Sequence, residues 1–155
     1  MFKKLSELFW PRKAASVSKR ANVSVERGCW GEDVAVSHLR SIGWSIVERN
    51  ARPCRKDRRC EIDIVAYVPI ERQVVFVEVK THKQHSLYAN RLWAVNKRKK
   101  ANLLRACANW LMQRKWHGNY RFDVIEVYGE PDGLIPPEVD HIFNVKLFSP
   151  KWRFW

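Results

Sequence analysis

The chain has 155 residues, of which 46% are hydrophobic and 29% are charged. A chain of this length can bury enough apolar surface to fold as one domain, and its composition excludes a disordered polyelectrolyte. Lysine and arginine number 29 against 16 aspartate and glutamate, which gives a net charge of +13. This excess of positive charge calls for a polyanionic partner, and nucleic acid is the commonest one.

The segment 1–20 combines basic residues with a short apolar piece that Glu7 and Pro11 interrupt, so we interpret it as a basic arm and not as a signal peptide. No apolar run approaches the roughly 20 residues that a membrane-spanning helix needs, so we expect no membrane partner. Four cysteines without a secretion signal indicate reduced thiols and a cytoplasmic location. We divide the chain into a basic arm at 1–24, a domain at 25–148 and an aromatic, basic tail at 149–155.

The first predicted helix runs from Val25 to Ile42, with Ser24 as its N-cap and Gly43 as its left-handed end. Apolar residues recur along it at helical spacing, at Ala35, Val36 and Leu39. Glu32 lies three and four residues before Ala35 and Val36, beside this apolar stripe. A carboxylate in that position requires an explanation.

Three strands are predicted next, at 44–49, 60–68 and 74–80, with a cationic loop over 51–59 between the first two. If Pro69 to Arg72 form a four-residue hairpin loop, Asp63 lies directly opposite Glu78 in the antiparallel register. Like charges that close destabilise a hairpin unless a cation lies between them.

A second helix is predicted from Lys97 to Trp116, capped by Asn96. Its first turn is basic, which costs stability at the positive end of the helix dipole unless an anion binds there. Two further strands are predicted, at 120–128 and 141–148, with a turn at Pro136 and Pro137 between them. The order predicts an α/β fold: helix, three strands, helix, strand and a final strand, with a mixed central sheet flanked by helices.

The residues Glu61-Ile62-Asp63 followed by Phe76-Val77-Glu78-Val79-Lys80 resemble the PD-(D/E)XK signature of metal-dependent nucleases. Glu-x-Lys alone is frequent by chance, but further motifs follow in order. They are Gly31-Glu32 with Ala35, Arg49-Asn50, the run to Thr81, Arg121-Phe122-Asp123-Val124, and His141-Ile142 with Asn144. Together these motifs resemble the YraN family of small bacterial proteins, and the resemblance implies a restriction-endonuclease-like core.

The resemblance also implies a role for each site residue. Asp63 and Glu78 would bind Mg²⁺ or Mn²⁺, because both ions prefer hard oxygen ligands. Val79 would add its backbone carbonyl, and Glu32 would hold a metal-bound water. Lys80 would orient the attacking water and stabilise charge in the transition state.

Two basic clusters are candidate phosphate contacts. The loop contributes Arg52, Arg55, Lys56, Arg58 and Arg59, and the second helix contributes Lys97, Arg98, Lys99 and Lys100. Their number favours phosphate binding over the solvated surfaces that charge runs usually form. Simpler alternatives for the acidic residues stay open: an exposed cross-strand ion cluster for Asp63 and Glu78, and a dipole-stabilised helix start for Glu32. For Asp123 we prefer a structural bridge to Arg121 or to a lysine of the second helix.

The leading hypothesis is a metal-dependent nuclease that acts on DNA in preference to RNA. Branched or single-stranded forms are suggested by analogy, because fold relatives of this size include Holliday-junction resolvases. A symmetric substrate would favour a twofold homodimer, which the sequence neither requires nor excludes. The alternatives are a non-catalytic nucleic-acid-binding module and an accessory protein that docks through its tryptophan-rich termini.

Overall fold

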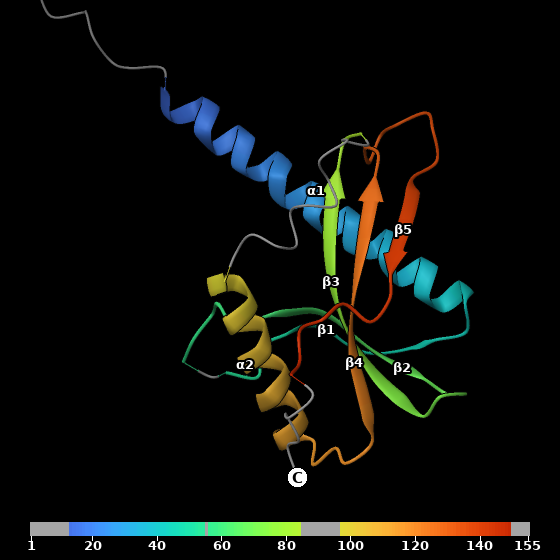
Figure 1. The fold of residues 1–155 in the computed structure, drawn as a ribbon. Helices are drawn as coiled ribbons and strands as arrows, with labels where there is room; N and C mark the ends of the chain where they lie inside the picture. Colours follow the sequence, from blue (N-terminus) through green and yellow to red (C-terminus); the bar gives the residue numbers. More distant parts are fainter. Residues whose placement is uncertain (1–12, 55, 85–96, 150–155) are drawn as a thin grey trace, which may run out of the picture.

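The computed structural model describes residues 13–54, 56–84 and 97–149. These residues form an α/β fold in which one mixed sheet lies between two helices (Figure 1), as predicted. The elements are α1 (Lys13–Ser41), β1 (Ser45–Ala51), β2 (Ile62–Val68), β3 (Gln73–His82), α2 (Lys97–Gln113), β4 (Asn119–Tyr128) and β5 (Glu138–Ile142).

The five strands follow the order β1-β2-β3-β4-β5. Neighbouring strands run antiparallel except β3 and β4, which are parallel. A parallel pair needs a crossover connection, and α2 lies in the connection between β3 and β4.

Each helix covers one face of the sheet (Figure 1). On one face, Leu39 of α1 packs with Val75 and Val77 of β3; on the other, Leu111 of α2 packs with Phe76. Because both faces are covered, the central strands are nearly continuous apolar runs. A charged side chain on these strands is therefore removed from water unless it lies at a strand end.

The β2–β3 hairpin has the predicted register. Val68 pairs with Gln73, and the pairing continues to Ile64 opposite Val77. The next step along both strands brings Asp63 beside Glu78. The four-residue loop therefore places the two carboxylates at the same level of the sheet.

The start of the first helix differs from the prediction. Helix α1 begins at Lys13, well before Ser24, and continues to Ser41. No glycine or proline lies between Lys13 and Ser24, and the alanines, the lysines and Arg20 there favour a helix, so nothing in the sequence stops it earlier. The helix passes through position 24, where we expected the arm to end.

The position of the final strand also differs from the prediction at 141–148. Strand β5 spans Glu138–Ile142 and pairs with β4 from Tyr128 opposite Glu138. Asn144 has a φ of 54° and donates its backbone N–H to Asp123 Oδ1 at 2.8 Å, which ends the extended conformation. Beyond it, Leu147 is buried in the core under α2. The apolar residues after Ile142 therefore complete a core instead of extending the sheet.

Two further findings concern the whole described part of the chain. None of its helices is both long and apolar enough to cross a bilayer. All four cysteines fall within it as free thiols, with Cys60 and Cys107 buried and Cys29 exposed.

Candidate active site

The centre of the candidate site is the pair of carboxylates that the β2–β3 hairpin brings together. Glu78 on β3 is 2% exposed. Asp63 on β2 accepts a hydrogen bond from the backbone N–H of Val79, at 2.7 Å, which fixes its carboxylate against β3. Burial, and then the charge of Glu78, raise the pKa of Asp63 to about 7. Two adjacent carboxylates that are this poorly exposed to solvent require nearby positive charge if both are to stay ionised.

Two lysines supply that charge. The Lys80 ammonium lies 2.6 Å from Glu78 Oε1, and the Lys99 ammonium contacts the same oxygen. Lys99 comes from the first turn of α2, across the face of the sheet. Burial lowers the pKa of Lys99, but the charge and hydrogen bond of Glu78, together with Lys80 and Asp63, outweigh burial and leave the pKa above its usual value. The structure thus joins β3 and α2 at one carboxylate, that of Glu78.

The contact between Lys99 and Glu78 is the feature that the sequence analysis missed, because we assigned Lys99 to a phosphate-binding cluster only. The spacing did contain a signal. Lys99 precedes Leu103 by four residues, and Leu103 is the first residue of the buried stripe of α2. Residues four apart share a helix face, so Lys99 extends the buried stripe toward the sheet.

The two carboxylates open into a pocket of about 180 Å³. Its walls combine charges of both signs from the basic loop, the hairpin and α2: Arg58, Arg59, Glu61, Asp63, Glu78, Lys99 and Leu103. Arg58 and Arg59 belong to the loop that the sequence predicted to bind phosphate. The structure therefore places part of that loop directly beside the acidic pair.

The basic loop is held in place by Asp57. Its carboxylate pairs with Arg59 Nε at 2.9 Å and also contacts Arg105 of α2. The hydrogen bonds from Arg59 hold the pKa of Asp57 well below its usual range. Arg105 also donates from Nε to Cys60 Sγ at 2.9 Å. This network ties the loop to α2, and nothing in the local sequence pattern indicated it.

Glu32 reaches the same region from α1. It accepts a hydrogen bond from Asn50 Nδ2 at 3.0 Å, and Arg49 lies 3.6 Å from the same carboxylate. Asn50 has a φ of 49°, a left-handed conformation that asparagine tolerates better than most residues, at the end of β1. The charge of Glu32 contributes to the raised pKa of Asp63. Its hydrogen-bond partner is nevertheless an amide, and its ion-pair partner is an arginine rather than a lysine of the site.

The remaining basic residues lie outside the pocket lining. Arg52 pairs at 3.0 Å with Glu61, which does line the pocket. Arg55 falls outside the described residues. The others are exposed, on the loop and on the first turn of α2: Lys56, Lys97, Arg98 and Lys100.

The acidic pair fits a divalent ion in part. Among the described residues, no group of three or more His, Cys, Asp or Glu side chains is arranged to hold a metal. However, Mg²⁺ usually keeps several waters and needs only one or two protein carboxylates. Two ammonium groups already converge on Glu78 Oε1, so this oxygen attracts cations. Asp63 and Glu78 are therefore the residues that could hold such an ion.

Comparison with known proteins places the chain in a family. The model of the "Uncharacterised protein family UPF0102" matches residues 31–127, which include Glu32 and both strands of the acidic pair. The chain belongs to the UPF0102 family. Two UPF0102 proteins, from Pelobacter propionicus and Geotalea daltonii, are 40% and 41% identical over 76% and 72% of this chain and 79% and 82% of their own. A UPF0102 protein from a Mycobacterium species (strain JLS) is 36% identical over 88% of this chain and 95% of its own.

The UPF0102 match also includes Asp123, which lies in a different cluster on the α1 side of the sheet. Asp123 is fully buried and bonds to Arg121 Nε at 3.1 Å and to His141 Nε2 at 3.0 Å. The other ring nitrogen of His141 lies 3.2 Å from His38 Nε2 on α1. The predicted bridge to Arg121 is therefore present, and this cluster joins α1, β4 and β5.

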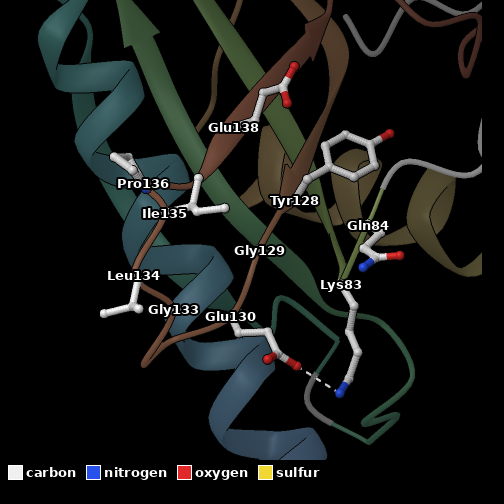
Figure 2. Close-up of a pocket in the computed structure, with 10 residues that line it drawn as sticks. All are labelled: Lys83, Gln84, Tyr128, Gly129, Glu130, Gly133, Leu134, Ile135, Pro136 and Glu138. Atoms are coloured by element: carbon white, nitrogen blue, oxygen red, sulfur yellow. Dashed lines mark ion pairs between the residues drawn. The ribbon is translucent and has the colours of Figure 1, made fainter.

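A larger hollow, of about 480 Å³, lies apart from the acidic pair (Figure 2). Two of its charged groups, Lys83 and Glu130, pair with each other at 2.7 Å at one edge (Figure 2). None of the predicted site residues of this UPF0102 protein lines this hollow. It is lined by Lys83, Gln84, Tyr128, Gly129, Glu130, Gly133, Leu134, Ile135, Pro136 and Glu138. We take the smaller pocket as the candidate active site, since a carboxylate with a raised pKa beside a buried one marks a catalytic centre better than volume does.

Proposed function

We propose that this UPF0102 protein is a metal-dependent nuclease that hydrolyses phosphodiester bonds in DNA. One observation carries the proposal: a buried carboxylate, Glu78, and a half-buried one, Asp63, from adjacent strands face a pocket edged by lysine and arginine side chains. Phosphodiester hydrolysis needs an activated water and a place for charge that develops on the phosphate oxygens. Mg²⁺ or Mn²⁺, when bound, would supply both.

Each side chain of the site has its own role in the proposed reaction. Asp63 and Glu78 would hold the ion, with the Val79 carbonyl as an additional ligand suggested by the family resemblance. Lys80, already fixed on Glu78, would place its ammonium where the attacking water and the phosphate charge lie. Glu32, held by Asn50, would orient a water at the α1 edge of the site.

The basic residues around the pocket favour a nucleic-acid substrate. Arg58 and Arg59 line it, and both can contact a phosphate with a planar, bidentate guanidinium. Lys97, Arg98 and Lys100 continue the positive charge along the first turn of α2. A phosphodiester backbone that crosses the pocket would meet both basic clusters. By analogy with fold relatives we place branched and single-stranded DNA first among substrates.

A second function has one observation in its favour. Glu78 already has two lysine partners, so the site is electrically satisfied without a metal. A nucleic-acid-binding module that retained these residues only for structure would look the same. The proposed nuclease and this alternative differ in cleavage, not in binding.

The test offers labelled linear, single-stranded, flap and four-way DNA, and RNA, with Mg²⁺ or Mn²⁺. We expect at least one DNA to be cut, and we expect Asp63→Ala and Lys80→Ala each to lower the rate at least 100-fold, a typical loss for groups that act on the transition state. Binding to the same DNA should change little with Asp63→Ala.

Asp132→Ala and Lys115→Ala are the matched controls, since both residues are exposed and lie outside the pocket lining. They should cut at the unmodified rate. If no substrate is cut although DNA binds, the non-catalytic module replaces the nuclease. If Asp63→Ala and Lys80→Ala cut as fast as the controls, another site is responsible.

A further inference from the structure

The acidic pair and its two lysines form a balanced set of charges. When both carboxylates are ionised, Asp63 and Glu78 are matched by Lys80 and Lys99, and both ammonium groups contact Glu78 Oε1. A site that is neutral overall attracts a divalent cation weakly. One of the two lysines must therefore leave Glu78 before a metal ion can use that oxygen.

The two lysines differ in how firmly they are held. Lys80 lies on β3, two residues from Glu78, and its side chain is 33% exposed. Lys99 reaches across from the first turn of α2, and its side chain is 50% exposed. A lysine has a long flexible stem, so Lys99 can turn toward solvent without moving the helix. Lys99 is thus the lysine that can leave.

The surroundings of Lys99 provide a second binding partner for its ammonium group once that group leaves Glu78. Lys99 lines the pocket with Arg58 and Arg59, and the first turn of α2 contains three more basic residues and no acidic one. A phosphate that enters the pocket would be an anion placed at the positive end of a helix, among cations. An ammonium displaced from Glu78 would find its next partner there.

We infer that Lys99 is a displaceable internal cation: it occupies Glu78 in the metal-free protein, yields that carboxylate to a divalent ion, and then contacts a substrate phosphate. The inference rests on the proposed function, since it concerns the same metal site and the same phosphodiester substrate. It assigns Lys99 two alternative partners, and Lys80 keeps its place in both states.

The test measures Mn²⁺ affinity in protein without nucleic acid, by calorimetry or by the electron paramagnetic resonance of free Mn²⁺. Lys99→Met removes the competitor, so we expect it to bind Mn²⁺ at least tenfold more tightly than the unmodified protein. Lys99→Arg keeps a cation there and should restore weak binding. Lys97→Met removes the same charge from the same helical turn without touching Glu78, and should change the affinity less than twofold.

A second readout separates displacement from a structural role. At saturating Mn²⁺, Lys99→Met should cleave DNA at least tenfold more slowly, although it binds the metal more tightly. Loss of folding would weaken metal binding and cleavage together, so opposite directions identify the exchange. Thermal unfolding of each variant in EDTA verifies that the fold is kept.

The outcomes distinguish this inference from the proposed function. Equal Mn²⁺ affinities for the unmodified protein and Lys99→Met overturn the exchange and leave the nuclease proposal standing. Tighter binding by Lys99→Met with no cleavage by any form supports the exchange and overturns the nuclease. No Mn²⁺ binding by either protein at millimolar concentration overturns both.

Discussion

At the residue scale, the site depends on two carboxylates. One is buried, and the other is fixed by a hydrogen bond from the backbone of β3. Glu78 is 2% exposed, and Asp63 is fixed by the Val79 N–H at 2.7 Å. The sequence could predict that these two face each other, because a four-residue loop sets the hairpin register. It could not predict their burial, which depends on α2 crossing above them.

The raised pKa of Asp63 has a consequence for stability. Burial and the charge of Glu78 raise it to about 7 in the folded protein, above its ordinary value of 3.8. Protonated Asp63 therefore stabilises the fold at acid pH, and this contribution is lost as the pH rises through about 7. Asparagine is uncharged at every pH, so Asp63→Asn should be more stable than the unmodified protein by roughly 1–3 kcal/mol at pH 8.

Urea unfolding in EDTA at pH 5 and pH 8 measures this difference. At pH 5 most of the gain should disappear, because Asp63 is then protonated in the folded protein. Asp132→Asn, on an exposed loop, is the control and should show no gain that depends on pH. An equal gain for Asp63→Asn at both pH values would show that Asp63 keeps an ordinary pKa.

At the element scale, the placement of α1 decides where Glu32 lies. Gly31 is buried, and a Cβ there would lie 2.1 Å from Thr81 Oγ1 on β3. Helix and strand thus approach more closely than any other residue would allow at position 31. This contact sets the position of the neighbouring Glu32 relative to β3, the strand that contains Glu78.

Gly31→Ala should therefore destabilise the fold by about 1–3 kcal/mol, in the range of overpacked core positions, although alanine favours a helix over glycine. Gly28→Ala is the matched control, one helical turn earlier with nothing within 4 Å of the added Cβ, and should gain up to about 1 kcal/mol. Chemical denaturation of both variants gives the two free energies. Similar gains for both would mean that α1 and β3 are not in close contact.

At the scale of the whole molecule, the net charge of +13 is the dominant property. The structure concentrates part of it around the candidate pocket, where Arg58, Arg59 and Lys99 lie beside the acidic pair. The other large cluster of charged groups, around Asp123, is buried and paired internally. The fold thus separates positive charge available to a partner from charge used for packing.

Duplex DNA binding should accordingly weaken steeply with salt. About six phosphate contacts give a slope near −5 when the logarithm of the affinity is plotted against that of the salt concentration. Arg58→Ala should reduce the slope by about 1, since it removes one contact. Lys115→Ala, just beyond the far end of α2, should reduce it less. A flat salt response of the unmodified protein would exclude a nucleic-acid partner.

The sequence by itself determined the pairing of β2 with β3 and the placement of Asp63 opposite Glu78, because local periodicity and loop length fix which side chains share a sheet face. It also indicated the α/β order, since each long element has its own spacing of apolar residues. It misplaced the start of α1, where helix-forming residues continue before Ser24, and it misplaced the last strand, where a contact with β4 decided the outcome. Asn144 turns the chain away from the sheet because Asp123 accepts its N–H at 2.8 Å, a contact between residues 21 positions apart.

Only the tertiary structure brought Lys99 to Glu78 and Arg59 to the pocket. These contacts join α2, the basic loop and β3, and no local pattern specifies the distance between such elements. The physical reason is that the spacing of apolar residues along a helix or strand indicates which of its faces is buried. Which other element that face packs against is decided only when the whole elements pack together. The acidic pair could thus be predicted from the sequence, but the contact of Lys99 with Glu78 could not.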